Sequence, residues 1–282
     1  MEYNQLIEKY LKPMNPIPTD HHFLGSLPHQ TKCVLFDIYG TLLISSSGDI
    51  GGDTIPEDNY QALQTLLNTN NCHIPPEKLL YQLKQSIETS HEHSRNKGID
   101  YPEVDMTSIW QRLLPHLSKK QIMQFAFEFE WIMNPVFPMP NLLETLSFIK
   151  KFSIDMGIIS NAQFYTPIIM SYFLKNALSS FGFISDLTFF SYELGWGKPS
   201  MKLFEAATDQ LKSKHIMPHS VLYVGNDMLK DIYPAQKAGF MTALFAGDKR
   251  SLRLRTENEL CQSIKPDGII TDLIQIKLLI ES

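Results

Sequence analysis

Residues 34–43 read VLFDIYGTLL, and this stretch decides the fold that we expect. Residues 34–37 are mostly apolar and predict a short buried strand that ends at the carboxylate of Asp37. Gly40 then lets the backbone turn where a side chain would clash. Ligands of open α/β sheets bind at the carboxyl ends of the strands, so Asp37 is a candidate nucleophile. Taken alone, the stretch fits an ordinary turn that contains an Asp equally well.

Composition excludes several classes of protein. The chain has 282 residues, 43% of them hydrophobic, and a formal net charge of −5. This length predicts a large α/β domain or a core with a second module, and it can bury a sizeable core as a monomer or a homodimer. The negative charge gives no general attraction to nucleic acid or to an anionic membrane surface, so neither is expected as a partner.

The expected compartment is the cytoplasm. No apolar run approaches the ~20 residues of a membrane span, and the N-terminal residues lack the apolar run of a secretory signal. The three cysteines are widely spaced and odd in number, which gives neither a disulfide framework nor a zinc-site spacing. A reducing environment suits this pattern.

Hydrophobic spacing divides the chain into three parts. Residues 1–31 predict an N-terminal arm, with a short helix followed by a proline-rich loop that packs on the core as an appendage. Residues 59–138 carry apolar side chains at helical spacing with no convincing strand, which predicts a helical insert that ends in a stiff proline-rich linker over 134–141. Residues 139–282 alternate strands and helices. Together with residues 32–58 they predict a parallel, doubly wound sheet.

Further candidate groups follow other predicted strands. Ser160 and Asn161 lie at a strand end that leads into a helix, where a hydroxyl, an amide and free helix N–H groups can hold phosphoryl oxygens. A plain helix cap is the alternative for this pair. Lys198, in GWGKPS, precedes another helix, where its charge can neutralise a transferring phosphoryl group. Most lysines are solvated, so this assignment depends on its neighbours.

The segment GNDMLKD contributes the last cluster. Asp227 follows a predicted strand and Asp231 lies four residues later, near the start of a helix. Together with Asp37 they are suitable oxygen ligands for Mg²⁺, which typically binds one or two carboxylates plus substrate phosphate and water. Acidic residues that merely complement the helix dipole are the alternative.

In this order, the four clusters resemble the motifs of the haloacid dehalogenase superfamily of phosphotransferases and hydrolases. Its first motif, Asp-x-Asp-x-Thr, appears as DIYGT, its second as ISNA, its third as the Lys of GKP and its fourth as GNDMLKD. The resemblance extends over about residues 32–280. It implies an α/β fold with a Rossmann-like parallel sheet core, and the helical insert is similar to the family's mobile helical cap domain.

The resemblance also implies roles in group transfer. Asp37 would be the nucleophile that forms a covalent aspartyl intermediate. Thr41 and Ser160, together with Asn161, would hydrogen-bond the transferring group, and Lys198 would neutralise its charge.

It implies a metal site as well. Mg²⁺ would be held by Asp37, the backbone carbonyl of Tyr39 and Asp227, with Asp231 orienting either Lys198 or metal-bound water. Counted back from Gly239, however, the longer spacing of the fourth motif puts Asn226 at the ligand position and the shorter spacing puts Asp227 there. Because a carboxylate binds Mg²⁺ better than an amide does, we expect Asp227 to be the ligand.

Tyr39 departs from the family's phosphatases, which carry a second Asp at this position as general acid and base. Without that group, we expect the hydrolysis of substrates with poor leaving groups to be slower by roughly 10²- to 10⁴-fold. Tyr is typical of the dehalogenase branch, whose cap carries a halide-binding Arg about thirty residues past the nucleophile. Here that spacing falls on residues 67–69, Leu-Asn-Thr, and the first Arg after Asp37 is Arg95. The pair His91 and His93 lacks the i, i+4 spacing of a zinc site.

These observations predict a cytoplasmic, Mg²⁺-dependent hydrolase, most simply a phosphatase acting on a small phosphorylated metabolite through an aspartyl-phosphate intermediate. One alternative is a 2-haloacid dehalogenase-like hydrolase. The other is a weakly active module that binds phosphate and Mg²⁺, which the missing second Asp suggests.

Overall fold

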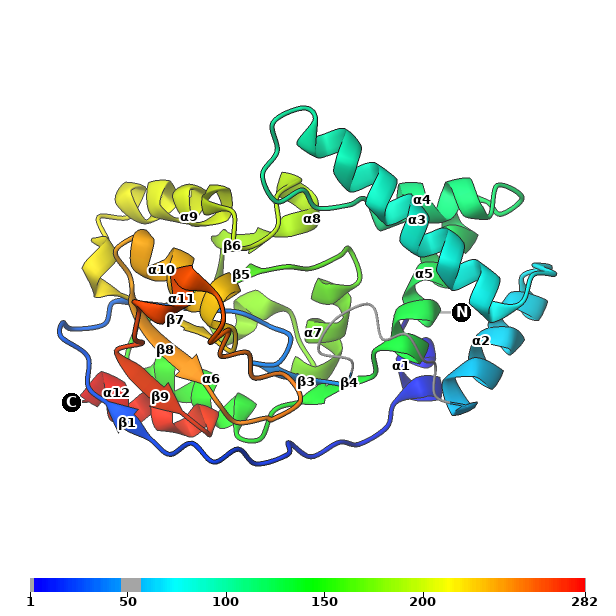
Figure 1. Ribbon diagram of the computed structural model, residues 1–282. Coiled ribbons are helices and arrows are strands. Elements are labelled where there is room, and N and C mark those ends of the chain that lie inside the picture. Colours follow the sequence, from blue (N-terminus) through cyan, green and yellow to red (C-terminus); the bar gives the residue numbers. More distant parts are fainter. Residues whose placement is uncertain (1–2, 47–56, 282) are drawn as a thin grey trace.

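A mostly parallel sheet forms the centre of the computed structural model, which describes residues 3–46 and 57–281 (Figure 1). Within these residues the sheet has seven strands in the order β1-β9-β8-β7-β2-β5-β6. β2 lies between β5 and β7 and is parallel to both. The strands are β1 (Leu24–Gly25), β2 (Cys33–Phe36), β5 (Asp155–Ser160), β6 (Phe183–Phe190), β7 (Val221–Gly225), β8 (Met241–Phe245) and β9 (Gly268–Ile270). The α/β prediction is therefore confirmed.

Helices cover both faces of the sheet, which is why β2 is a continuous apolar run. Successive strand residues point to opposite faces, so Val34 and Phe36 share one core cluster while Cys33 and Leu35 share another. The first face is covered by α6 (Leu142–Lys151), α7 (Thr166–Leu174) and α12 (Ile276–Glu281), and the second by α9 (Met201–Ser213) and α10 (Tyr233–Lys237). The short helices α8 (Ser191–Leu194) and α11 (Glu259–Gln262) complete this part.

Four further helices, here called the cap helices, gather on one side of the molecule (Figure 1). They have their own apolar cluster. In it, the ring centroid of Trp110 lies 5.0 Å from that of Phe125 and 4.7 Å from that of Phe129. Ser118 caps the N-terminus of the last one with a capping box. The cap helices are α2 (Glu57–Thr69), α3 (Pro76–Arg95), α4 (Met106–Leu113) and α5 (Lys119–Met133).

A two-stranded antiparallel ribbon lies where the chain passes between sheet and cap helices. β3 (Leu43–Ser45) pairs with β4 (Val136–Pro138). Part of the 134–141 segment is thus a strand, where the sequence predicted only a stiff linker. Its pairing partner lies some ninety residues earlier in the chain, and so local patterning gave no sign of it. Residues 47–56, which were predicted to belong to the core as part of a loop beside the nucleophile, are outside the described residues.

The N-terminal arm is more than the expected appendage. Its helix α1 (Tyr3–Tyr10) packs against the cap helix α5, where the hydroxyl of Tyr10 donates to Glu128 at 2.8 Å. Further along the arm, β1 adds an antiparallel edge strand beside β9. Two exposed residues carry no hydrophobic alternation, so this strand could not be predicted. Among the helices described, none combines the length and apolar character that crossing a bilayer needs.

Candidate active site

The central strand β2 delivers Asp37 to the carboxyl edge of the sheet. The backbone N–H of Asp37 donates to the carbonyl of Val224 at 2.9 Å, which extends the pairing with β7 by one step. Three residues on, Gly40 has a φ of 83°. A Cβ there would lie 2.6 Å from Cβ of Ser251 and 2.8 Å from Nδ2 of Asn226, so only glycine fits this turn.

The carboxylate of Asp37 is held asymmetrically. Its Oδ1 accepts hydrogen bonds from Oγ of Ser160 at 2.8 Å and from Nζ of Lys198 at 2.7 Å. Its Oδ2 receives no hydrogen bond from the described residues. The side chain is 6% exposed and lines a cavity. One oxygen is thus fixed by charged and neutral donors while the other is free to attack a ligand.

Lys198 joins two carboxylates. Its Nζ lies 2.5 Å from Oδ1 of Asp231 as well as 2.7 Å from Asp37, and it donates to the hydroxyl of Tyr223 at 3.2 Å. Burial alone would lower the pKa of Lys198, but the charges of Asp231 and Asp37 outweigh it and raise the pKa. The ammonium is therefore charged at neutral pH.

Asp231 completes this buried network. Burial raises the pKa of its carboxyl to about 6, against the opposing charge of Lys198. Its Oδ2 accepts from the backbone N–H of Asp227 at 2.9 Å. A Cβ at Gly225 would lie 2.4 Å from Cγ of Asp231, which explains the glycine at the end of β7. The structure therefore brings Asp231 to Lys198, the first of the two partners that the resemblance implied for it.

Two residues that were predicted to contact the transferring group also hold neighbouring protein groups in place. The amide of Asn161 clamps the backbone of Lys198: Oδ1 accepts from its N–H at 2.6 Å and Nδ2 donates to its carbonyl at 3.3 Å. The hydroxyl of Thr41 is fully buried and donates to Oδ1 of Asn226 at 3.1 Å. Each side chain keeps unused hydrogen-bonding capacity, so its contact with the transferring group stays a prediction.

Asp227, the predicted metal ligand, lines the cavity with Asp37 and is bound to protein groups in this structure. Its Oδ1 accepts from the backbone N–H groups of Leu229 at 2.8 Å and Lys230 at 3.1 Å, and Nη2 of Arg255 lies 2.7 Å from its Oδ2. Burial opposes ionisation of Asp227, but the bonds from Arg255 and the backbone outweigh it and lower the pKa. The carboxylate thus caps a turn and forms an ion pair.

Asn226, the alternative ligand that the longer spacing gave, lines the same cavity as Asp37. A wide π-helical turn, Met228–Ile232, follows β7 and accommodates the longer spacing between Asn226 and Asp231. The amide of Asn226 is oriented by Thr41 and by its own 2.6 Å bond from Nδ2 to the carbonyl of Ser251. Its Oδ1 keeps a second acceptor position.

The remaining donors fit Mg²⁺ with a single carboxylate. Among the residues that the structure describes, no three His, Cys, Asp or Glu side chains are arranged to hold a metal. Asp37, the amide oxygen of Asn226 and the backbone carbonyl of Tyr39 remain as hard oxygen donors. Mg²⁺ sites commonly contain one or two carboxylates with substrate phosphate and water, so this set, with one carboxylate, has the smallest usual number.

A cavity of about 440 Å³ lies over Asp37 and is walled by both parts of the molecule. Its walls are rich in charged side chains, some of which the sequence did not point to. From the cap side come His91, Arg95, Glu103 and Glu130, and from the core Arg253 and Arg255. Glu130, Arg253 and Arg255 lie outside the four motifs, in helices and loops where charged residues are usually solvated, so no local signal separated them from other surface charges.

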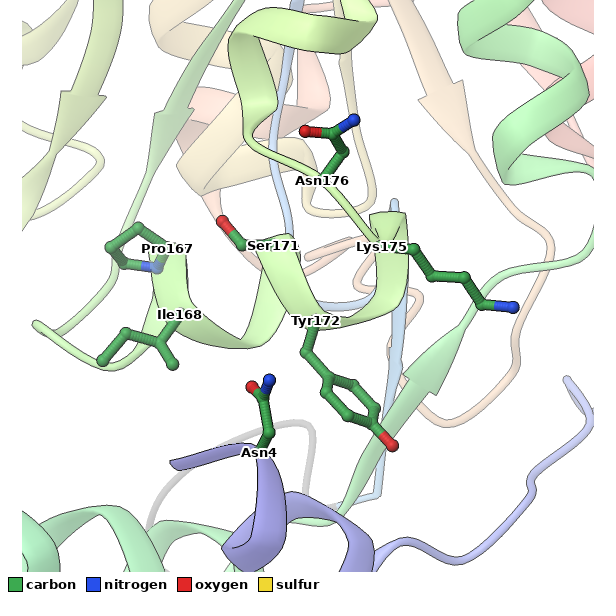
Figure 2. A pocket seen from close by; sticks show the side chains of 7 residues that line it. All are labelled: Asn4, Pro167, Ile168, Ser171, Tyr172, Lys175 and Asn176. Carbon is green, nitrogen blue, oxygen red and sulfur yellow. The ribbon is translucent and has the colours of Figure 1, made fainter. Parts of the chain in front are cut away.

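A second hollow lies between α1 and α7, with a volume of about 700 Å³ (Figure 2). Figure 2 shows Asn4 of α1 close to Tyr172 and Ile168 of α7. None of the residues predicted to be catalytic lines it.

Comparison with known proteins agrees with this architecture. The model of the haloacid dehalogenase-like hydrolase family matches residues 31–239, and the chain belongs to this family of hydrolases. A search of curated proteins returns no match.

Solved structures share the fold at low sequence identity. The 2-haloacid dehalogenase of Pseudomonas syringae pv. Tomato is 20% identical with a TM-score of 0.54, over 89% of this chain and 98% of that one. The HAD phosphatase of Thermococcus onnurineus is 16% identical with a TM-score of 0.52, over 88% and 97%. The putative HAD-hydrolase YfnB of Bacillus subtilis, bound to magnesium, is 16% identical with a TM-score of 0.52, over 90% and 100%. These structures include both dehalogenases and phosphatases. The likeness therefore establishes the fold, and the substrate has to be inferred from the residues of the site.

Proposed function

We propose that the protein hydrolyses a small phosphorylated metabolite through a covalent intermediate on Asp37. The observation that carries the proposal is the asymmetric binding of the Asp37 carboxylate, with Oδ1 held by Ser160 and Lys198 and Oδ2 free. A carboxylate oriented in this way can attack phosphorus in line with a leaving group.

In the first step, Oδ2 of Asp37 forms a bond to phosphorus while the bond from phosphorus to the leaving oxygen breaks. In the second step, water attacks phosphorus and the bond to Asp37 breaks, which releases phosphate and regenerates the carboxylate. Lys198 supplies fixed positive charge beside the transferring group, and Asp231 holds that ammonium in place. Such preorganised charge in a buried site typically contributes ~10²- to 10³-fold to the rate.

The proposed reaction uses Mg²⁺ as a cofactor. Asp37, Asn226 and the backbone carbonyl of Tyr39 would hold it, and when bound it would neutralise charge on the phosphoryl oxygens. The charged cavity walls support a polar substrate, and arginines on both sides of the cavity suit an anionic one. The cap side of the cavity would exclude water during transfer.

A second candidate is a 2-haloacid dehalogenase. The observation that favours it is that each of three aspartates in the site is already paired with a cation: Asp37 and Asp231 share Lys198, and Asp227 pairs with Arg255. Displacement of halide by Asp37 needs neither a metal nor an acid for the leaving group.

Product analysis separates the two candidates. We would measure phosphate release from a panel of phosphorylated metabolites and halide release from 2-chloropropionate, each with Mg²⁺ and with EDTA. The phosphatase proposal predicts phosphate release that EDTA abolishes. Halide release that persists in EDTA, with no phosphate released from any ester, would replace it by the second candidate.

A further inference from the structure

The acid that assists the leaving group is missing from its usual place in this family. Tyr39 stands there, and its hydroxyl shares a 2.8 Å hydrogen bond with Oγ1 of Thr166. Burial raises the pKa of this phenol, and the nearby carboxyls of Glu130 and Asp37 raise it further. A phenol with so high a pKa transfers a proton poorly near neutral pH. Another group must supply the proton if unactivated esters are to be hydrolysed.

Glu130 is a carboxyl of the cap side that faces the same cavity as Asp37. It lies near the C-terminal end of α5, one turn before Asn134. Its Oε2 accepts from the hydroxyl of Tyr165 at 2.8 Å, and its Oε1 accepts from Nδ2 of Asn134 at 3.1 Å. Each carboxyl oxygen has a second acceptor position, so both can still exchange a proton with a ligand.

The other acidic side chains of the cavity wall are less suited to proton transfer. Asp227 forms the ion pair with Arg255, and Asp231 is bound to Lys198. Glu103 accepts from the backbone N–H of Val104 at 2.9 Å, from Gln163 at 3.1 Å and from Ser191 at 2.6 Å, so it ties a cap loop to the core. Glu130 differs from Asp227 and Asp231 in that its partners among the described residues, a phenol and an amide, are neutral, and from Glu103 in that it accepts two hydrogen bonds rather than three.

The surroundings of Glu130 favour its neutral form. Burial raises the pKa of its carboxyl, and the hydrogen bonds from Tyr165 and Asn134 oppose this without cancelling it. The titratable groups that face it are Tyr165, at the start of α7, and Tyr39, on the loop after β2. Burial raises the pKa of both phenols, so both are uncharged at neutral pH. A carboxyl poised in this way can donate a proton and later accept one.

We propose that Glu130 is the general acid and general base of this hydrolase, in place of the Asp that Tyr39 replaces. The inference rests on the proposed function. In the first step the proton of Glu130 passes to the leaving oxygen as its bond to phosphorus breaks. In the second step the Glu130 carboxylate takes a proton from water as water attacks phosphorus and the Asp37–phosphorus bond breaks. Each cycle returns both carboxyls to their initial states.

The position of Glu130 links catalysis to the cap. Tyr165 belongs to the core, so its hydrogen bond to Glu130 spans the boundary between the cap helices and the sheet. The acid would be in place only when that bond is formed.

Glu130→Gln tests the inference with phosphate esters of graded leaving-group acidity. An activated aryl phosphate needs no acid, so its pre-steady-state burst should change by no more than a few fold, while steady-state turnover slows because water attack loses its base. Hydrolysis of an alkyl phosphate should fall by roughly 10²- to 10⁴-fold. Equal losses of burst rate and alkyl phosphate hydrolysis would overturn the assignment.

Glu128→Gln is the matched control. Glu128 lies on the same helix but faces α1, where it accepts from Tyr10 and Lys9. This variant should show no dependence on the leaving group. If it reproduces the pattern of Glu130→Gln, the effect is one of helix stability and the inference fails.

Tyr165→Phe gives a second test in case Glu130→Gln does not fold. It removes a hydrogen bond that lowers the pKa of Glu130, so the acid should remain protonated to higher pH. The alkaline limb of kcat/KM for an alkyl phosphate should move upward, which a purely structural role would not cause. An unmoved limb contradicts the inference. If the wild type shows no burst that depends on Asp37, the proposed function itself has failed.

Discussion

Arg255 forms an ion pair with Asp227: its Nη2 lies 2.7 Å from Oδ2 of that carboxylate. The neighbouring Asn226 presents its amide oxygen at the site instead, oriented by Thr41. A phosphatase built on this site would therefore bind Mg²⁺ through one carboxylate where two are common, and we expect its affinity for the ion to be weak.

Asn226→Asp should strengthen Mg²⁺ binding, because it adds a second carboxylate at the ligand position. Calorimetric titration of the substrate-free protein with Mg²⁺ measures this directly, and an increase of at least about tenfold is expected. Asp227→Asn is the control and should leave the affinity within about twofold of the wild type. A loss of Mg²⁺ binding in Asp227→Asn would show that Asp227 is the ligand after all.

Lys198→Met should lower both activity and stability. Removing the ammonium leaves Asp37 and Asp231 buried without their cation, for which we expect a loss of about 3–5 kcal/mol in the free energy of unfolding. Activity should fall by at least ~10²-fold. Urea denaturation and burst kinetics measure the two effects.

The stability loss in Lys198→Met should also depend on pH. In the variant the folded-state pKa of Asp231 lies above its unfolded value, since burial already raises the pKa of Asp231 to about 6 with the lysine present. The stability penalty from this carboxyl is therefore largest above that pKa and shrinks as the pH falls towards the unfolded-state value of ~3.9, where the carboxyl protonates in both states. A penalty that stays constant across this range would show that lost packing, rather than unpaired charge, is responsible.

Tyr39→Asp should restore a proton donor two residues after the nucleophile. Hydrolysis of alkyl phosphates should rise, within the ~10²- to 10⁴-fold range of general acid catalysis, while the burst with an activated aryl phosphate changes little. Tyr39→Phe, which removes only the hydroxyl bound to Thr166, serves as the control and should show no such gain. If both variants respond alike, loss of the phenol explains the effect and the new carboxyl does not act as an acid.

The sequence predicted those parts of the fold and site that depend on local pattern. A buried apolar strand that ends in Asp37 needs only its own residues to be recognised, and the same holds for Ser160 at the end of β5. The order of these strand ends along the chain then placed Asp37, Ser160, Lys198 and Asp231 together, as the structure has them.

Features that depend on distant contacts could not be predicted. The direction of Asp227 is set by Arg255, twenty-eight residues later, and by a π-helical turn that no propensity announces. Glu130 lies on a helix far from every motif, and only the docking of α5 against Tyr165 brings it to the cavity. The ribbon of β3 and β4 likewise joins segments that are remote in sequence.

The central claim is that Asp37 becomes covalently bound during hydrolysis. The most direct measurement is the pre-steady-state release of phenolate from an activated aryl phosphate by the wild type and by Asp37→Asn, in the presence of Mg²⁺. We predict a burst that approaches one equivalent per active site in the wild type and no release in Asp37→Asn, because a neutral amide is a far weaker nucleophile than a carboxylate. Release by Asp37→Asn at the wild-type rate would contradict the account.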